Sequence, residues 1–114
     1  MEIEVRNEAD VTVIEAKGAM KVGEPGPKVW ETTLEALDAG GRKIVLNLGG
    51  VTGLDSGGVG ELVALQTSAE HRGGQVKLAE LSPKVESVLQ ATQIVGVLEI
   101  YPYEADAITS FVTG

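Results

Sequence analysis

The sequence predicts a single α/β domain spanning residues 1–114, in which a mixed sheet of about five strands packs against four helices. After an initial pair of strands, segments with helical periodicity alternate with strand-like segments, which gives the order β-β-α-β-α-β-α-β-α. This alternation predicts parallel pairing through right-handed crossovers. The length of 114 residues suits one hydrophobic core, and 43% hydrophobic with 23% charged residues predicts a folded chain.

The N-terminal third predicts two strands and a helix. Apolar and polar residues alternate around Ile3 and Val5 and again from Val11 to Gly18, so we expect an antiparallel pair. In the GEPGPK stretch that follows, Pro27 suits the first turn of a helix. Apolar residues then recur with the i, i+3, i+4, i+7 spacing of a helix before a glycine pair ends it. The residues with this spacing are Trp30, Thr33, Leu34 and Leu37, and the glycine pair is Gly40-Gly41.

The rest of the chain alternates strands with helices. KIVLNL at residues 43–48 is almost continuously apolar, which indicates a strand buried on both faces of a sheet. Ser82 and Pro83 suit the N-cap and first-turn positions of a helix. The predicted elements are, in order, a strand at 43–48, a helix from Ser56 to Arg72, a strand at 75–81, a helix from Pro83, a strand at 97–101 and a helix from about Tyr103.

The charge of the chain restricts its partners. A formal net charge of −8 and a pI of about 4.5 disfavour direct DNA binding and anionic membranes, and favour a basic protein surface. No apolar run approaches the roughly 20 residues that a transmembrane segment needs, and the acidic start MEIEVRNEAD is unlike a secretory signal. Cysteine is absent, which excludes disulfides and thiolate chemistry. We therefore expect a cytoplasmic protein without a transmembrane segment.

The stretch GLDSGGVGEL at residues 53–62 gathers glycines around one acid and one hydroxyl. A P-loop requires G-x-x-x-x-G-K-[ST], and no Gly-Lys-Ser or Gly-Lys-Thr occurs in the sequence. A nucleophile elbow requires glycine where Leu54 stands. The single histidine, His71, lies in the same predicted helix as Ser56, about 22 Å away at 1.5 Å per residue. With scattered carboxylates as the remaining ligands, we expect no catalytic residue, no metal site and no cofactor, and hence no enzyme.

A helix cap and an accessible serine remain as roles for this stretch. Asp55 or Ser56 can act as N-cap by accepting a hydrogen bond from an early helix N–H. A cap does not explain Gly57, Gly58 and Gly60, because each glycine in a helix costs about 0.5–1 kcal/mol relative to alanine. We expect these glycines to leave the helix N-terminus open, so that another molecule can approach the backbone and the Ser56 hydroxyl.

The segment LNLGGVTGLDSGGVGEL at residues 46–62 resembles the STAS domain family, which occurs in sulfate transporters and anti-sigma factor antagonists. The hallmark of the family is a strand of the form LDLSGV, a short loop and then D-S-x-G-[aliphatic]-[small]-x-[aliphatic]. Residues 73–94 and 98–108 also resemble the family, so the resemblance covers essentially the whole chain and implies a STAS-like fold. The residues that match the motif are Asp55, Ser56, Gly58, Val59, Gly60 and Leu62.

The resemblance implies a regulatory binding module. In anti-sigma factor antagonists, the serine that matches Ser56 is phosphorylated by a partner that is both serine kinase and anti-sigma factor. The unphosphorylated form binds that partner and frees the sigma factor, and a serine phosphatase restores this form. The implied function is therefore partner switching in transcription regulation. An alternative is a STAS scaffold subunit of a stress-signalling assembly or of a transporter complex, and a weak homodimer is also left open.

The sequence departs from the family pattern in two places. Asn47 stands where the family strand has aspartate, and we expect it to change the charge near the phosphorylation site. GAMKVGEPGP at residues 18–27 replaces the glycine-x-leucine-aspartate of the family and places Met20 and Lys21 in a partner-facing loop. The partner-binding residues implied by the resemblance are Asp55, which positions the hydroxyl, with Gly57, Gly58, Val59, Glu61, Met20, Lys21 and Asn47.

Overall fold

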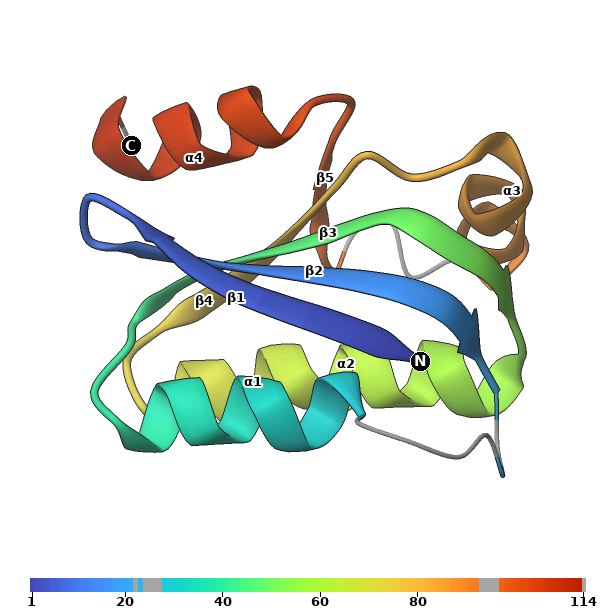
Figure 1. Cartoon of the computed structure of the whole chain (residues 1–114), viewed down its shortest axis with the longest axis horizontal. Helices are drawn as coiled ribbons and strands as arrows, with labels where there is room; N and C mark the ends of the chain where they lie inside the picture. Colours follow the sequence, from blue (N-terminus) through green and yellow to red (C-terminus); the bar gives the residue numbers. More distant parts are fainter. Residues whose placement is uncertain (22, 24–27, 93–96, 114) are drawn as a thin grey trace.

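The computed structural model describes residues 1–21, 23, 28–92 and 97–113. These residues form a mixed α/β fold with the predicted order of elements, which Figure 1 shows. The prediction of a five-stranded sheet with four helices is thereby confirmed. The elements are β1 (Glu2–Glu8), β2 (Val11–Met20), α1 (Val29–Asp38), β3 (Lys43–Leu54), α2 (Ser56–His71), β4 (Gln75–Ala79), α3 (Pro83–Ala91), β5 (Glu99–Tyr101) and α4 (Glu104–Thr113).

The five strands form one sheet in the order β1-β2-β3-β4-β5. β1 and β2 are antiparallel, as predicted, and every later pair is parallel. Helices α1 and α2 cover one face of the sheet, α4 lies on the opposite face, and α3 lies toward the end of the sheet at which β3 ends (Figure 1). This edge, where the parallel strands have their carboxyl ends, also carries the start of α2.

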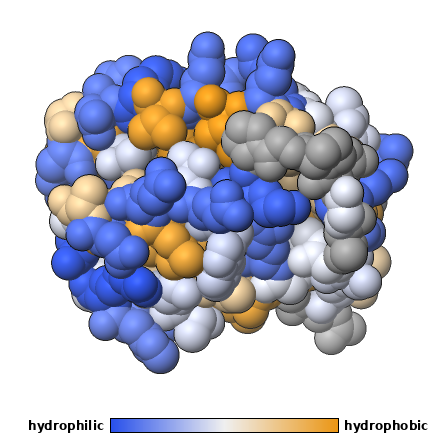
Figure 2. All heavy atoms as spheres, turned by 60° about the horizontal axis from the view of Figure 1, so that its bottom comes forward, coloured by the Kyte–Doolittle hydropathy of each residue, from blue (hydrophilic) through white to orange (hydrophobic). Residues whose placement is uncertain are grey.

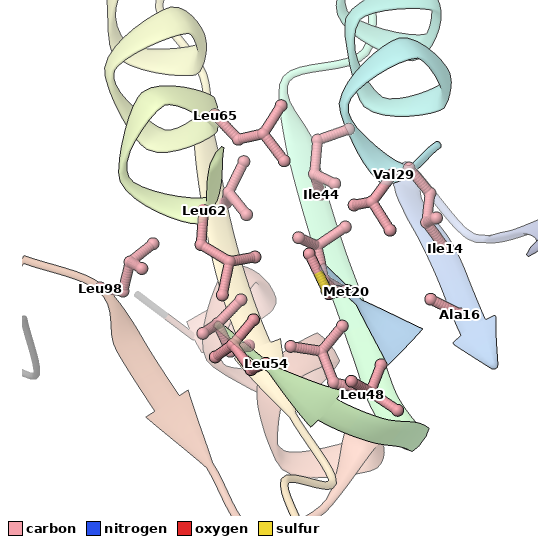
Figure 3. Close-up of a cluster of buried hydrophobic side chains, with 14 of the residues drawn as sticks. Ile14, Ala16, Met20, Val29, Ile44, Leu48, Leu54, Leu62, Leu65 and Leu98 are labelled. Atoms are coloured by element: carbon pink, nitrogen blue, oxygen red, sulfur yellow. The ribbon is translucent and has the colours of Figure 1, made fainter. Parts of the chain in front are cut away.

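The main hydrophobic core lies between the sheet and helices α1 and α2. Ile44 and Leu46 of β3 point to this side and pack in one cluster with Leu62 and Leu65 of α2, part of which Figure 3 shows. Val45, between them, points to the other face and packs in a smaller cluster under α4. The alternation follows from the two-residue period of a strand. Burial of KIVLNL on both faces is thus confirmed.

Strand β3 is longer than the sequence predicts, because it continues past residue 48 to Leu54. β2 explains the extension, since it runs to Met20 and pairs with β3 as far as Met20 opposite Leu54. The register shifts twice along this pair, so the two strands stay together through the glycine-rich part of β3. Pro27, expected in the first turn of a helix, lies outside the described residues, and α1 begins at Val29.

Helix α4 is fixed to the sheet by polar as well as apolar contacts. The Oε2 of Glu80, a residue with a φ of 64°, accepts a hydrogen bond of 2.6 Å from the backbone N of Glu104 and so caps the helix. Lys77 is buried, and its Nζ donates to Ser110 Oγ at 2.7 Å and lies 4.1 Å from the centroid of the Phe111 ring. These contacts anchor both halves of α4.

Thr33 of α1 gives a prediction for the core. Its side chain is fully buried, and its Oγ1 has no hydrogen-bond partner among the described residues. Because a buried, unpaired hydroxyl is costly, Thr33→Val is expected to raise the free energy of unfolding by about 1 kcal/mol. Urea denaturation measures this change. Thr32→Val, at a half-exposed neighbouring position, is the control and should change stability by less than about 0.5 kcal/mol; a loss of stability in Thr33→Val would show that the hydroxyl has a role.

Candidate functional site

The site is built on the first turn of α2, which follows β3 directly. Asp55 is the N-cap: it has extended backbone angles, and its Oδ1 accepts a hydrogen bond of 2.9 Å from the backbone N of Gly58. Its carbonyl oxygen accepts from Val59 N at 3.0 Å, which starts the helical hydrogen bonding. Of the two caps considered from the sequence, the structure therefore selects Asp55. Ser56 is the first helical residue, and its side chain is exposed.

Gly58 has a different role from the one expected from the sequence. It is buried, and a Cβ at this position would lie 2.4 Å from the carbonyl oxygen of Met20 and 2.5 Å from Cδ1 of Leu54. The helix therefore packs directly on the end of β2, and glycine permits that approach. Gly60 is exposed, and a Cβ there would meet nothing within 4 Å. The expectation that Gly58 keeps the helix end open is wrong, because packing against β2 covers this residue.

Some of the other residues predicted for the site are buried beneath the turn, and others are exposed beside it. The side chains of Met20 and Val59 are buried, with 3% and 6% exposed, so they support the turn from beneath. Gly57 is half-buried, and Lys21 is exposed. A Cβ on Gly53 would lie 3.6 Å from the Nζ of Lys21, so this ammonium lies beside the segment that leads into Asp55. Ser56 and Lys21 thus form the exposed part of the predicted site.

Glu61 connects the site to α1. This residue is half-buried in the second turn of α2, and its Oε1 accepts a hydrogen bond of 2.8 Å from the backbone N of Trp30. Trp30 is the second residue of α1, so Glu61 satisfies one of the N–H groups that the start of a helix leaves unpaired. A negative charge is also favourable at this end of a helix. Glu61 therefore holds the start of α1 against α2, a role that the sequence does not indicate.

Asn47 lies on the face of the sheet that α4 covers. Its Nδ2 donates to Glu104 Oε1 of α4 at 3.0 Å, and its Oδ1 accepts from the backbone N of Gly49 at 2.9 Å. The two-residue period of β3 turns this side chain to the face opposite α1 and α2. That Asn47 changes the charge near the proposed phosphorylation site stays a prediction. Asn47 acts as a donor to a carboxylate of α4.

Glu104 is the centre of a polar cluster with Asn47 and Arg6. The Arg6 guanidinium donates to Glu104 Oε1 at 2.5 Å and holds the pKa of Glu104 below its ordinary value of 4.5. Partial burial opposes this shift, and the hydrogen bond from Asn47 reinforces it. A lowered carboxyl pKa in the folded state means that this stabilisation is present above pH 4.5 and is lost as the pH falls through the pKa of the folded state.

Replacing Asn47 with aspartate is a direct test of this cluster. Asn47→Asp would exchange the donor for a second carboxylate beside Glu104, and we expect it to lower the free energy of unfolding at pH 7 by about 2 kcal/mol. The pair would have a pKa above that of the unfolded chain, so the loss should shrink as the pH falls below about 5. Urea denaturation from pH 4 to 8 measures the difference in the free energy of unfolding between variant and wild type. Asn7→Asp, at an exposed position of β1, is the control; an equal loss at all pH values would contradict the proposed carboxylate repulsion.

The described residues gather no group of three or more His, Asp or Glu side chains that could hold a metal ion. His71 is exposed at the far end of α2 from Ser56. Among the described residues no helix is long and apolar enough to cross a membrane. In the view of α1 and α2 in Figure 2, hydrophilic residues separate the apolar areas of the surface.

Fold and site together define a small α/β domain that presents a serine at the start of a helix. The chain belongs to the STAS domain family, whose model matches residues 2–107. Domains of this family are in general regulatory and not enzymatic. A search of curated protein sequences found no match.

Solved structures share this fold. An anti-sigma-factor antagonist (STAS) domain protein from Planctomyces limnophilus is 27% identical, with a TM-score of 0.75 and 95% of each chain covered. The Bacillus cell fate determinant SpoIIAA in its phosphorylated form is 20% identical, with a TM-score of 0.68, and the match covers 96% of this chain and 99% of SpoIIAA. The murine anion transporter Slc26a9 is 16% identical, with a TM-score of 0.76, over 96% of this chain and 19% of the transporter.

Proposed function

We propose that this protein is an anti-sigma factor antagonist that is switched by phosphorylation at Ser56. The unphosphorylated form binds an anti-sigma factor that is also a serine kinase, and this binding releases the sigma factor in the cytoplasm. Phosphorylation ends the interaction, and a serine phosphatase reverses it. The observation that carries the proposal is the exposed Ser56 at the first turn of α2, within a motif that matches the STAS family.

The surroundings of Ser56 are compatible with a phosphate. A phosphoserine carries a charge of about −1.5 to −2, which the dipole and the free N–H groups of a helix N-terminus favour. The Lys21 ammonium beside Gly53 adds a positive charge at the same end of the sheet. We therefore expect the phosphorylated domain to keep its fold. The switch acts on the complex, because the added charge must be desolvated when a partner covers the turn.

The proposed partner surface consists of the exposed residues of the turn and the segment beside it. Ser56 and Lys21 are accessible to a partner, with Gly57 and Asp55 half-buried beside them. Met20, Gly58 and Val59 act from beneath by fixing the position of the turn. Glu61 fixes the start of α1 next to this surface. A basic partner surface suits the net charge of −8.

A pull-down from the lysate of the native organism tests the proposal. Wild-type protein as bait should retain a serine kinase that acts as an anti-sigma factor, and mass spectrometry identifies it. The Ser56→Asp bait should not retain this protein. Capture of the same kinase by both baits, or capture of no such kinase by the wild-type bait, would contradict the proposal.

The similarity to a transporter domain supports a second candidate, a STAS scaffold subunit of a transporter or stress-signalling assembly. Size-exclusion chromatography with light scattering distinguishes the two. The leading proposal predicts a monomer or a weak homodimer that forms a small complex with its kinase. The scaffold predicts a large assembly whose mass does not change with phosphorylation of Ser56.

A further inference from the structure

A pocket lies away from Ser56, between α3 and the segment that joins β5 to α4. It has a volume of about 260 Å³. Its walls come from β5, from the segments that follow β4 and β5, and from the first turn of α3. The lining residues are Leu81, Glu86, Ile100, Tyr101, Pro102 and Tyr103.

The walls of the pocket combine apolar side chains with a larger share of polar surface, which includes one carboxylate among the described residues. Leu81 and Ile100 are half-buried and pack against the main core, so the apolar part of the pocket is firmly supported. Tyr103 is 64% exposed. Glu86 is exposed, and its carboxylate makes no hydrogen bond or ion pair with any other described residue. Among the described residues, the lining includes no lysine, arginine or histidine that would neutralise Glu86.

Size and charge together restrict the ligand. A volume of about 260 Å³ is below the roughly 300–1,000 Å³ of pockets for drug-sized ligands, so it suits one long side chain better than a whole cofactor. The net charge of −8 and the single carboxylate disfavour an anion. An aliphatic stem that ends in a cation matches both the apolar side chains of the wall and Glu86, and the exposed ring of Tyr103 can attract a cation.

We propose that this pocket receives an arginine or lysine side chain of a protein partner. The stem lies against Leu81 and Ile100, and the cationic group pairs with Glu86. The pocket thus provides a contact separate from the Ser56 turn. The inference does not depend on phosphorylation. It can therefore fail while the proposed function stands, and the proposed function can fail while this inference stands.

NMR titration of the whole chain with short blocked peptides tests this inference. The probe is acetyl-Gly-Arg-Gly-amide, and the control is the same peptide with citrulline, which has the same shape and no charge. The arginine peptide should shift the amide signals of residues 81, 86, 100 and 103 at low salt. Glu86→Gln should weaken its binding about fivefold, and added salt should weaken it further. Glu35→Gln, at an exposed position of α1, should leave binding unchanged.

Three results would overturn the inference. Equal shifts with the citrulline peptide would show that the charge is not recognised. Signals that shift elsewhere, or equal binding by Glu86→Gln, would show that the pocket is not the site. Much tighter binding of the free polyamine spermidine than of the arginine peptide would assign the pocket to a small cationic metabolite and not to a protein side chain.

Discussion

Ser56→Asp is expected to weaken binding of the anti-sigma factor partner about a hundredfold, a loss of about 2.7 kcal/mol. The aspartate places a charge on the exposed first residue of α2, where the partner would cover it. Because desolvating an uncompensated charge in an interface is costly, the effect should appear mainly in the dissociation rate. Ser56→Ala keeps the surface neutral and should bind within about threefold of wild type. Isothermal titration calorimetry with the purified partner measures both variants.

A matched charge elsewhere separates a local effect from an effect of net charge. Asn7→Asp adds one negative charge to an exposed position of β1 and should leave the affinity unchanged. Equal weakening by Asn7→Asp and Ser56→Asp would show that Ser56 is not at the interface. Circular dichroism should show that Ser56→Asp keeps its fold, because a negative charge is favourable at a helix N-terminus.

Gly58→Ala is expected to lower the free energy of unfolding by about 2–3 kcal/mol. Its Cβ would lie 2.4 Å from the carbonyl oxygen of Met20, a backbone atom that can move only if the end of β2 moves. The side chain of Leu54, 2.5 Å away, can adjust more easily. The substitution therefore separates α2 from β2, and the midpoint of urea denaturation should fall accordingly.

Gly60→Ala, in the same helical turn, is the control for this prediction. A Cβ at Gly60 meets nothing within 4 Å, so alanine should raise the free energy of unfolding by about 0.5–1 kcal/mol. Stabilisation by Gly58→Ala, or destabilisation by both variants, would contradict the packing role given to Gly58. The sequence places both glycines in one motif, and their expected effects have opposite signs.

Much of the fold follows from local patterns in the sequence. The order of elements rests on periodicity within single segments, and the caps at Asp55 and Ser82 need only neighbouring residues. The extension of β3 to Leu54 has no local pattern in the sequence, because it depends on pairing with β2. Glycine has a low propensity for strands, so this segment does not look like a strand in the sequence. Pairing with β2 stabilises it as a strand in the fold.

The candidate site follows from the sequence in its residues, but not in the contacts that those residues make. Ser56 and its cap follow from the motif, whereas the hydrogen bond from Trp30 to Glu61 joins residues 31 apart in the sequence. The contact between Asn47 and Glu104 joins residues 57 apart. Comparison with the family pattern marks Asn47 as unusual but cannot place it on the opposite face of the sheet. Such contacts follow from tertiary packing and have no local sequence signal.

Phosphate transfer is the most direct test of the central claim that Ser56 is the switch. Purified protein is incubated with its anti-sigma factor kinase and Mg-ATP, and the phosphorylated residue is mapped by tandem mass spectrometry. We expect one phosphate per chain, located at Ser56, and none in the Ser56→Ala variant. Incorporation at another residue, or no incorporation by a kinase that binds the protein and is active on a control substrate, would contradict the account.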